Sequence, residues 1–234
     1  MFIDCALIDA DSIYFKVCMK TQKKHEIRVG IDRKMRDISK YVGTDNIFVA
    51  VKGEGNFRKD LSSDYKKNRK PHEEHIRKAL TYGHSYMIEK HKAIMANAME
   101  ADDLVSIWAK ECRDLEKDYV VVGIDKDLLQ IPGWHMNFDR MDDQYIDEDM
   151  GNYKLMLQCL TGDNSDNIKG IKGVGPKKAE KILAGVPMER RWNRVKAAWR
   201  KHNAGNPMDA WRLLKMIETW GEHEEILQQI SKSQ

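Results

Sequence analysis

Residues 161–179, TGDNSDNIKGIKGVGPKKA, constrain the structure of this chain more than any other segment. The segment begins with two carboxylates, Asp163 and Asp166, in a turn rich in Gly, Asn and Ser. Three glycines follow, and then Pro176, which predicts a helix start because Pro loses no hydrogen bond at the first helical position. Glycines ahead of a helix start allow backbone N–H groups to approach a phosphate closely. The segment therefore predicts a phosphate-binding hairpin beside a pair of carboxylates.

The hairpin also carries a surplus of positive charge. Its candidate phosphate-contacting residues are the glycines and lysines Gly170, Gly173, Gly175, Lys169, Lys172, Lys177 and Lys178. A Gly-rich loop followed by a solvated basic helix is the alternative interpretation, because short glycine motifs are common. Together with the two carboxylates, the hairpin favours a metal-dependent enzyme that acts on a nucleic-acid backbone.

The charge of the chain is segregated, although its net charge is only +3 over 234 residues. Residues 167–215 contain 13 Lys and Arg against 3 Asp and Glu, whereas residues 100–166 contain 6 against 17. Solubility alone explains such a separation poorly. It is typical of a metal-binding centre beside a surface that binds a polyanion.

Carboxylates follow two predicted strands. Residues 2–8, FIDCALI, predict a buried strand that ends at Asp9, and residues 120–122 predict a second that ends before Asp125 and Asp127. Ligands of α/β proteins bind at the carboxyl ends of the central strands. We therefore expect these carboxylates to lie in a binding site.

A third group of acids opens a predicted helix, where Glu100 and Asp103 lie one turn apart with Asp102 beside them. Acids in a first helical turn also stabilise the helix dipole, which is the structural alternative. The repeated acidic groups would repel one another if they met without cations. Oxygen ligands without Cys or His favour Mg²⁺, with Mn²⁺ as a substitute, and two such ions suit an in-line phosphodiester hydrolysis.

Other segments predict an α/β fold. We expect a helix over 31–42, a strand over 46–51, a short hairpin or edge strand over 134–149 and a helix over 153–160, followed by basic helices. Residues 72–95 also predict a helix, with so few apolar residues that we expect a mobile arch or lid. Just before it, aromatic and basic residues alternate in a pattern that suits stacking on bases and holding phosphates: Phe57, Arg58, Tyr65, Lys66, Lys67, Arg69 and Lys70. A solvated helix face is the alternative.

Five segments carry a family resemblance, in this order along the chain: LIDADS, FRKDLSSDYKKNRKP, MEADDL, GIDKDLLQ and TGDNSDNIKGIKGVGPKKA. They resemble the 5′-nuclease superfamily, in its bacterial and phage form of flap endonuclease and 5′–3′ exonuclease. The resemblance covers most of residues 3–182. It implies a mixed, largely parallel central sheet flanked by helices, with a helical arch and a helix–three-turn–helix DNA clamp. We accordingly expect a nuclease core over 1–160, with the arch at about 60–99, and a DNA-binding helical region over 161–234.

The resemblance also assigns roles to individual residues. It implies a first metal ion held by Asp9, Glu100, Asp102, Asp125 and Asp127, and a second held by Asp103, Asp163 and Asp166. Tyr65, Lys66 and Arg69 match residues at the arch base that stack on the substrate and neutralise it, and Arg58 and Lys67 are further candidate DNA contacts. The hairpin glycines match a clamp whose amides touch duplex phosphates and whose carbonyls hold K⁺.

One position departs from the pattern of this family, in which the second strand ends in an aspartate. Counting back from Phe57 and Arg58 places Val51 there, and Glu54 is the nearest candidate substitute. The expected activity is hydrolysis of DNA near 5′ single-strand/duplex junctions, on 5′ flaps, nicked or gapped duplexes and 5′ ends, and on RNA/DNA hybrids such as primers. A branched-DNA-binding protein without efficient catalysis is the alternative that Val51 favours, and a PIN-like RNase is a third.

The four cysteines, at positions 5, 18, 112 and 159, form no CxxC pair, so we expect buried, reduced thiols in a cytoplasmic protein. The first residues carry charge within their apolar run, which excludes a signal peptide, and no later segment is apolar for long enough to span a membrane. We expect a monomeric, free-standing nuclease without a leading extension or a following polymerase domain.

Overall fold

A six-stranded sheet with the order β3-β2-β1-β4-β5-β6 forms the centre of the computed structural model, which describes residues 3–232. Strands β1 to β5 pair in parallel, and β6 runs antiparallel to β5. The prediction of a mixed, largely parallel sheet is therefore confirmed. The strands are β1 (Cys5–Asp9), β2 (Ile47–Lys52), β3 (Ile94–Ala96), β4 (Tyr119–Val122), β5 (Gly133–Asn137) and β6 (Asp142–Ile146), with a separate ribbon of β7 (Gly162–Asp163) and β8 (Ile168–Lys169).

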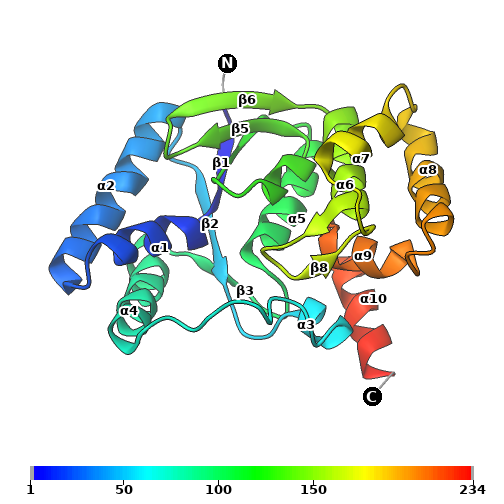
Figure 1. The fold of residues 1–234 in the computed structure, drawn as a ribbon. Helices are drawn as coiled ribbons and strands as arrows, with labels where there is room; N and C mark the ends of the chain where they lie inside the picture. Colours follow the sequence, from blue (N-terminus) through cyan, green and yellow to red (C-terminus); the bar gives the residue numbers. More distant parts are fainter. Residues whose placement is uncertain (1–2, 233–234) are drawn as a thin grey trace.

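Helices cover both faces of this sheet and continue into a group beside it (Figure 1). They are α1 (Asp11–Lys20), α2 (Lys24–Val42), α3 (Phe57–Leu61), α4 (Glu74–His91), α5 (Ala101–Asp114), the 3₁₀ turn η1 (Asp127–Gln130), α6 (Glu148–Thr161), α7 (Pro176–Leu183), α8 (Met188–Lys201), α9 (Pro207–Leu214) and α10 (Trp220–Ser231).

The alternation of side chains along β1 divides the core between the two faces. Leu7 packs in one apolar cluster with residues of α5, whereas Ile8 packs in another with residues of α1, α2 and α4. Both side chains are fully buried, since successive residues of a strand point to opposite faces. A strand buried on both faces is a continuous apolar run in the sequence, which is why FIDCALI predicted it. Phe2, at the start of that prediction, lies outside the described residues.

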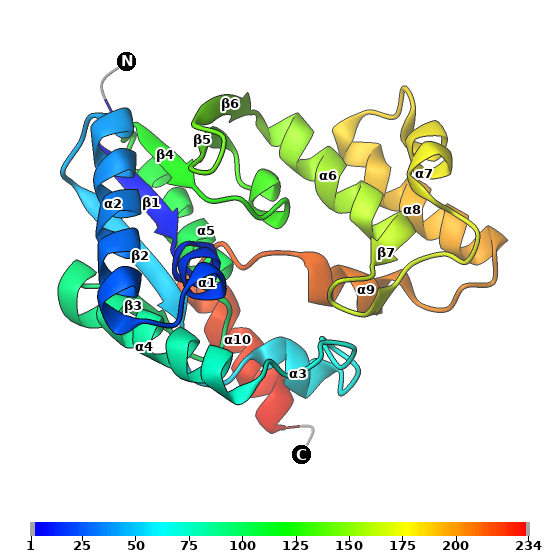
Figure 2. The same cartoon turned by 60° about the vertical axis from the view of Figure 1, so that its left-hand side comes forward.

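A third apolar cluster joins α6, α7, α8 and α9 (Figure 2). Trp199 is at its centre, only 5% exposed, and its indole N–H donates to the carbonyl of Cys159 at 3.0 Å. The apolar clusters extend across the predicted domain boundary at residue 160, because segments on each side of it pack with the other side. Helix α6 precedes it and packs in this cluster, whereas Ile226 and Ile230 of α10 pack against the cluster that contains Leu7. The two-part division stays a prediction.

Several boundaries differ from the predicted ones. Helix α1 and strand β3 had not been predicted, and α2 begins seven residues before the expected residue 31. Charged residues at the start of α2 weaken its apolar repeat there, so the pattern alone placed its start too late. Trp220, at the start of α10, is 47% exposed, and its indole N–H donates to Glu111 at 3.1 Å.

Helix α4 lies against α1 and α2 rather than standing free as an arch. Ala79, Gly83 and Met87 are buried in this packing, and a Cβ at Gly83 would come within 2.8 Å of the Cys18 sulfur. The small residues therefore allow close approach of two helices, which an apolar-repeat argument does not detect. Residues 62–73, which precede α4, contain no regular helix or strand. The mobility of this segment stays a prediction.

All four cysteines are free thiols and buried, as expected. No helix within residues 3–232 is both long enough and apolar enough to cross a membrane.

Candidate nuclease active site

A cavity of about 410 Å³ opens at the carboxyl end of the central strands. Asp9, at the end of β1, and Asp125, just after β4, both line it, together with Glu100 and Asp102 from the start of α5. The structure thus brings together four of the five residues predicted for the first metal ion. They meet because β1 and β4 are parallel neighbours whose ends lie at one edge of the sheet.

The start of α5 is fixed by hydrogen bonds between its own acids. Glu100 is the N-cap residue, and its side chain and that of Asp103 form a reciprocal capping box. The Asp103 carboxylate accepts from the Glu100 N–H at 3.0 Å, and the Asp102 carboxylate accepts from the Asp103 N–H at 2.8 Å. These acids therefore cap the start of α5, yet Glu100 and Asp102 also line the cavity.

The carboxylates of the cavity differ in how their charge is compensated. Burial and, after it, the neighbouring carboxylates, led by Asp11, together raise the pKa of Asp9 to about 8. Burial also raises the pKa of Glu100, but the cations Lys66 and Arg58 outweigh it and the net pKa is lowered. Asp9 therefore has excess negative charge around it that a bound cation would offset.

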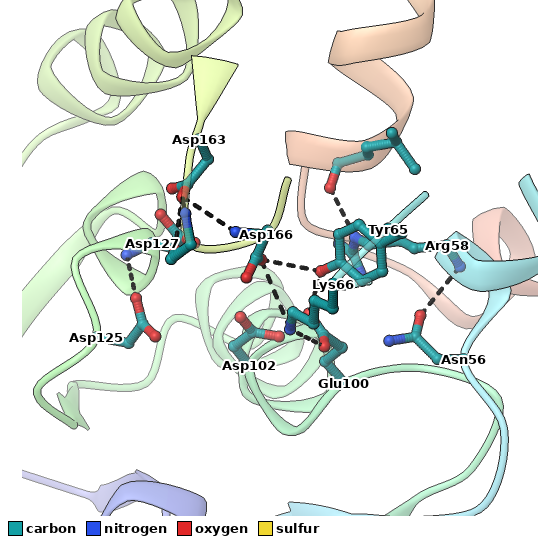
Figure 3. A network of polar contacts seen from close by, with 12 residues as sticks. Asn56, Arg58, Tyr65, Lys66, Glu100, Asp102, Asp125, Asp127, Asp163 and Asp166 are labelled. Atoms are coloured by element: carbon teal, nitrogen blue, oxygen red, sulfur yellow. Dashed lines mark hydrogen bonds and ion pairs between the residues drawn. The ribbon is translucent and has the colours of Figure 1, made fainter. Parts of the chain in front are cut away.

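A second acidic group lies beside the first (Figure 3). Asp163 ends β7, and Asp166 lies in the loop between β7 and β8. Both are buried, and Asp163 forms an ion pair with Lys126. Gln158 donates to Asp127 at 2.5 Å, and burial together with Asp125 raises the pKa of Asp127 to about 6. Asp127 thus lies between the two groups that the prediction assigned to separate ions.

The loop before α4 is docked onto both acidic groups (Figure 3). Lys66 forms an ion pair with Glu100 and lies 3.6 Å from Asp166, and Arg69 pairs with Asp166 at 2.7 Å. The Tyr65 hydroxyl donates to Glu100 at 2.8 Å and to Asp166 at 3.1 Å. Tyr65 is only 4% exposed, so in this structure it orients two carboxylates and cannot stack on a base as predicted.

Arg58 was predicted to contact DNA and Asp103 to bind a metal ion, but in the structure the two side chains bind each other. Their side chains are 3% and 0% exposed and form a two-pronged ion pair, in which Nη2 of Arg58 lies 2.8 Å from Asp103. Arg58 also donates to the carbonyls of Leu213 and Lys215, and Asp103 accepts from the N–H of Ile217. With all these partners inside the protein, neither side chain is available to a ligand.

The predicted hairpin follows β8 and leads into α7, which begins at Pro176 as expected. The side chains of Lys67, Lys169, Lys172, Lys177 and Lys178 are all exposed. Gly173 has φ +79° in open space, so it permits the turn, and Gly175 precedes α7, whose first-turn N–H groups have no partner within a helix. Gly170 has another role, since a Cβ there would come within 2.2 Å of Gly162.

No three His, Cys, Asp or Glu side chains within residues 3–232 are close enough together to hold a metal ion as they stand. Instead, two of the acids form ion pairs with lysine side chains: Glu100 with Lys66, and Asp163 with Lys126. The donor set nevertheless fits a hard divalent cation, because it consists of carboxylate oxygens around one cavity. Cations that displaced the two lysines would free carboxylate oxygens of Glu100 and Asp163, on either side of Asp127.

Reasoning from the sequence missed several polar residues at this site. Lys126 stands inside the DKD motif and was not considered, and Gln158 and Ser165 support Asp127 and Asp163. Position within the quoted motifs would have identified Lys126 and Ser165, whereas Gln158 becomes visible only once α6 is placed. Glu54, the suggested substitute at the Val51 position, is exposed and does not line the cavity.

These features define an α/β protein with a carboxylate-lined cavity at its strand ends and a basic hairpin beside it. A family model described as 5′-3′ exonuclease, N-terminal resolvase-like domain, matches residues 4–154. The chain belongs to this family, and the resemblance found in its motifs is confirmed.

Named relatives match over part of their length. Flap endonuclease Xni of Shewanella piezotolerans is 33% identical over 147 residues, which is 58% of this chain and 58% of that protein. DNA polymerase I of Rhizobium leguminosarum is 36% identical over 138 residues, 54% of this chain and 14% of that protein. The matched region thus spans little more than half of the Xni protein and a small part of the polymerase.

Solved structures share the fold over nearly the whole chain. A flap endonuclease of bacteriophage T5 in complex with DNA and metal ions has a TM-score of 0.70 at 15% identity, covering 98% of this chain and 97% of that one. The T5 5′-exonuclease with bound zinc has a TM-score of 0.72 at 14% identity, with 97% and 98% covered. At such identities the likeness establishes the fold, as the sequence motifs implied.

Proposed function

We propose that this protein is a divalent-metal-dependent, structure-specific 5′-nuclease that hydrolyses DNA near 5′ single-strand/duplex junctions. The observation that carries the proposal is the cavity lined by Asp9, Glu100, Asp102 and Asp125, with Lys66 at its edge. Family membership and the T5 fold support the same activity. The proposed substrates are 5′ flaps, nicked or gapped duplexes and 5′ ends, and they extend to RNA primers in RNA/DNA hybrids.

Different residues of the chain would have different roles at the reacting phosphate. Lys66 and Arg69 bring positive charge to the cavity edge, where they would neutralise the scissile phosphate and the charge that grows on it during hydrolysis. Tyr65 holds Glu100 and Asp166 in position through its hydroxyl. The exposed lysines of the 170–178 hairpin and the N–H groups at the start of α7 would bind the duplex backbone and set the distance from duplex to cavity.

We propose that the residues which would hold divalent cations are those of the two acidic groups, with Mg²⁺ as the resident ion and Mn²⁺ as a substitute. Bound there, such cations would stabilise the negative charge of the leaving oxygen and favour ionisation of the attacking water. The hairpin carbonyls are a candidate K⁺ site, although Lys178 donates to the Gly173 carbonyl at 2.7 Å and would have to move. A monomer suffices for all these groups, since one chain supplies them.

Cleavage of a 5′-labelled flap substrate in Mg²⁺, in Mn²⁺ and in EDTA tests the activity. We expect cutting in either metal ion and none in EDTA, and product lengths separate cutting at the flap base from stepwise removal of nucleotides. Asp125→Asn is the matched variant, because Asp125 is exposed and the fold does not depend on its charge. It should abolish cutting while DNA binding is retained, and undiminished turnover in this variant would contradict the metal-dependent mechanism.

A branched-DNA-binding protein without efficient catalysis is the second candidate function. Val51 favours it, because its side chain is fully buried in the apolar cluster with Ile8 and contributes no carboxylate to the site. Tight binding of the flap substrate with no cutting in either metal ion would establish this function instead.

A further inference from the structure

Strand β2 ends beside the cavity without supplying a carboxylate of its own. Val51 points into the apolar core, and the next residue, Lys52, lines the cavity with a cationic side chain. Glu54 follows in an exposed turn and does not line the cavity. The neighbouring strands β1 and β4, in contrast, are each followed or ended by a cavity carboxylate, Asp9 and Asp125.

A carboxylate from another element lies over the end of β2. Asp11 is the first residue of α1, and its Oδ1 accepts from the Lys52 N–H at 3.0 Å and from the Tyr14 hydroxyl at 3.0 Å. These two bonds fix the position of the carboxylate against β2. Its own N–H donates to Asp9 Oδ1 at 3.1 Å, so Asp9 and Asp11 are directly linked.

The remaining oxygen of Asp11 is available to a ligand. Within residues 3–232, Oδ2 of Asp11 makes no hydrogen bond, and Asp11 lines the same cavity as Asp9, Glu100, Asp102 and Asp125. Asp9 is only 6% exposed, and its Oδ2 likewise has no hydrogen-bond partner in this part of the chain. Asp9 and Asp11 thus each keep one carboxylate oxygen without a hydrogen bond while the other oxygen is fixed, an arrangement that a cation completes.

The charges around the cavity support this interpretation. Of its five carboxylates only Glu100 is in an ion pair within the described chain, while Asp9, Asp11, Asp102 and Asp125 have none. Asp11 lies directly beside Asp9, since its N–H donates to Asp9 Oδ1. Lys52 and His84 also face Asp11 and offset part of its charge. Placing two such carboxylates together without a compensating cation is unfavourable.

We propose that Asp11 is a metal-binding residue of this site and supplies from α1 the carboxylate that β2 lacks. The inference rests on the proposed function, since it concerns the divalent cation of the same cavity. The competing explanation is that Asp11 only fastens α1 to the end of β2 through its Oδ1 contacts.

Asp11→Asn separates the two explanations, because an asparagine Oδ1 can still accept from Lys52 and Tyr14 while the charge is lost. Binding of Mn²⁺ to the DNA-free protein is measured by calorimetry, and thermal unfolding is measured in EDTA. We expect Mn²⁺ affinity to fall at least about tenfold, with thermal unfolding in EDTA unchanged or shifted to higher temperature because Asp9 loses a like charge. Glu54→Gln is the control acid and should leave Mn²⁺ affinity unchanged.

Equal Mn²⁺ affinity in wild type and Asp11→Asn would overturn the inference while leaving the proposed function in place. A lower unfolding temperature in EDTA with unchanged Mn²⁺ affinity would also overturn it, in favour of a fastening role. Absence of Mn²⁺ binding to the wild-type protein would overturn both the inference and the proposed function.

Discussion

Lys66 illustrates how much a single cation does at this site. Its ammonium group pairs with Glu100 and lies 3.6 Å from Asp166, so it joins acids from α5 and from the β7–β8 loop. The backbone N–H of Lys66 also donates to the carbonyl of Asp166 at 2.9 Å. Both ends of the residue are therefore tied to the acidic groups, whereas the adjacent Lys67 is exposed and forms an ion pair with Asp64 in its own loop.

Lys66→Ala should lower turnover far more than DNA affinity. Its charge is needed most when negative charge grows on the phosphate in the transition state, an effect worth on the order of 10²-fold in rate. Single-turnover cleavage at saturating protein gives the rate, and binding in Ca²⁺ gives the affinity. Lys67→Ala is the matched control, in which we expect weaker binding with an unchanged saturating rate. A pure loss of affinity in Lys66→Ala would make this residue a tether.

At the scale of elements, the hairpin and α7 form a unit whose backbone geometry depends on glycine. Gly173 provides the left-handed turn, Gly170 allows β8 to pass against Gly162, and Pro176 starts the helix. These roles are local, so they follow from the spacing in the sequence. The direction in which the lysine side chains point depends on tertiary packing instead. The exposure of Lys172 and Lys177 is consistent with a phosphate-binding surface.

Lys172→Ala and Lys177→Ala should each weaken duplex binding and reduce the slope of log affinity against log salt by about 1, because one phosphate contact releases about one counterion. Fluorescence anisotropy over a range of salt concentrations measures this slope. Lys40→Ala on α2 serves as the control, since Lys40 is exposed on a helix far from α7 in both views of the molecule (Figures 1 and 2). An unchanged slope in the hairpin variants would place the DNA on another surface.

At the scale of the whole molecule, the Arg58–Asp103 pair connects parts of the chain that are distant in sequence. Arg58 belongs to α3 and Asp103 to α5, and both also bond the backbone of residues 213–217, which cover the end of α9 and the start of its connection to α10. Through this pair the start of α5, and hence Glu100 and Asp102, is braced against the C-terminal segment.

Arg58→Met should destabilise the protein by about 3–5 kcal/mol, because it leaves the buried charge of Asp103 without its partner. The double variant Arg58→Met/Asp103→Leu should recover much of the loss, since no unpaired charge remains. Urea unfolding followed by circular dichroism gives the free energies. Arg140→Met, which breaks a solvent-exposed pair with Asp142, is the control and should change stability little. Equal stability of Arg58→Met and wild type would show that the pair does not brace the fold.

Local patterns determined much of the fold and the identity of most site residues. Buried strands such as β1 and β4 are apolar runs, and the acids at their ends follow these runs directly in the sequence. The hairpin is a glycine motif. Each of these features can therefore be inferred from a few neighbouring residues. The parallel pairing of β1 with β4 then places Asp9 and Asp125 together, as expected for strand ends in such a sheet.

The tertiary structure alone decided which charged residues face the cavity and which face inward. Arg58 and Asp103 carry the same kinds of charge as Lys66 and Asp102, yet the first two are enclosed and the others line the site. Asp11 lies beside the end of β2 only because α1 and β2, far apart in sequence, meet there. Composition and spacing cannot predict such contacts, because burial and pairing depend on the elements that pack around a side chain and not on its sequence neighbours.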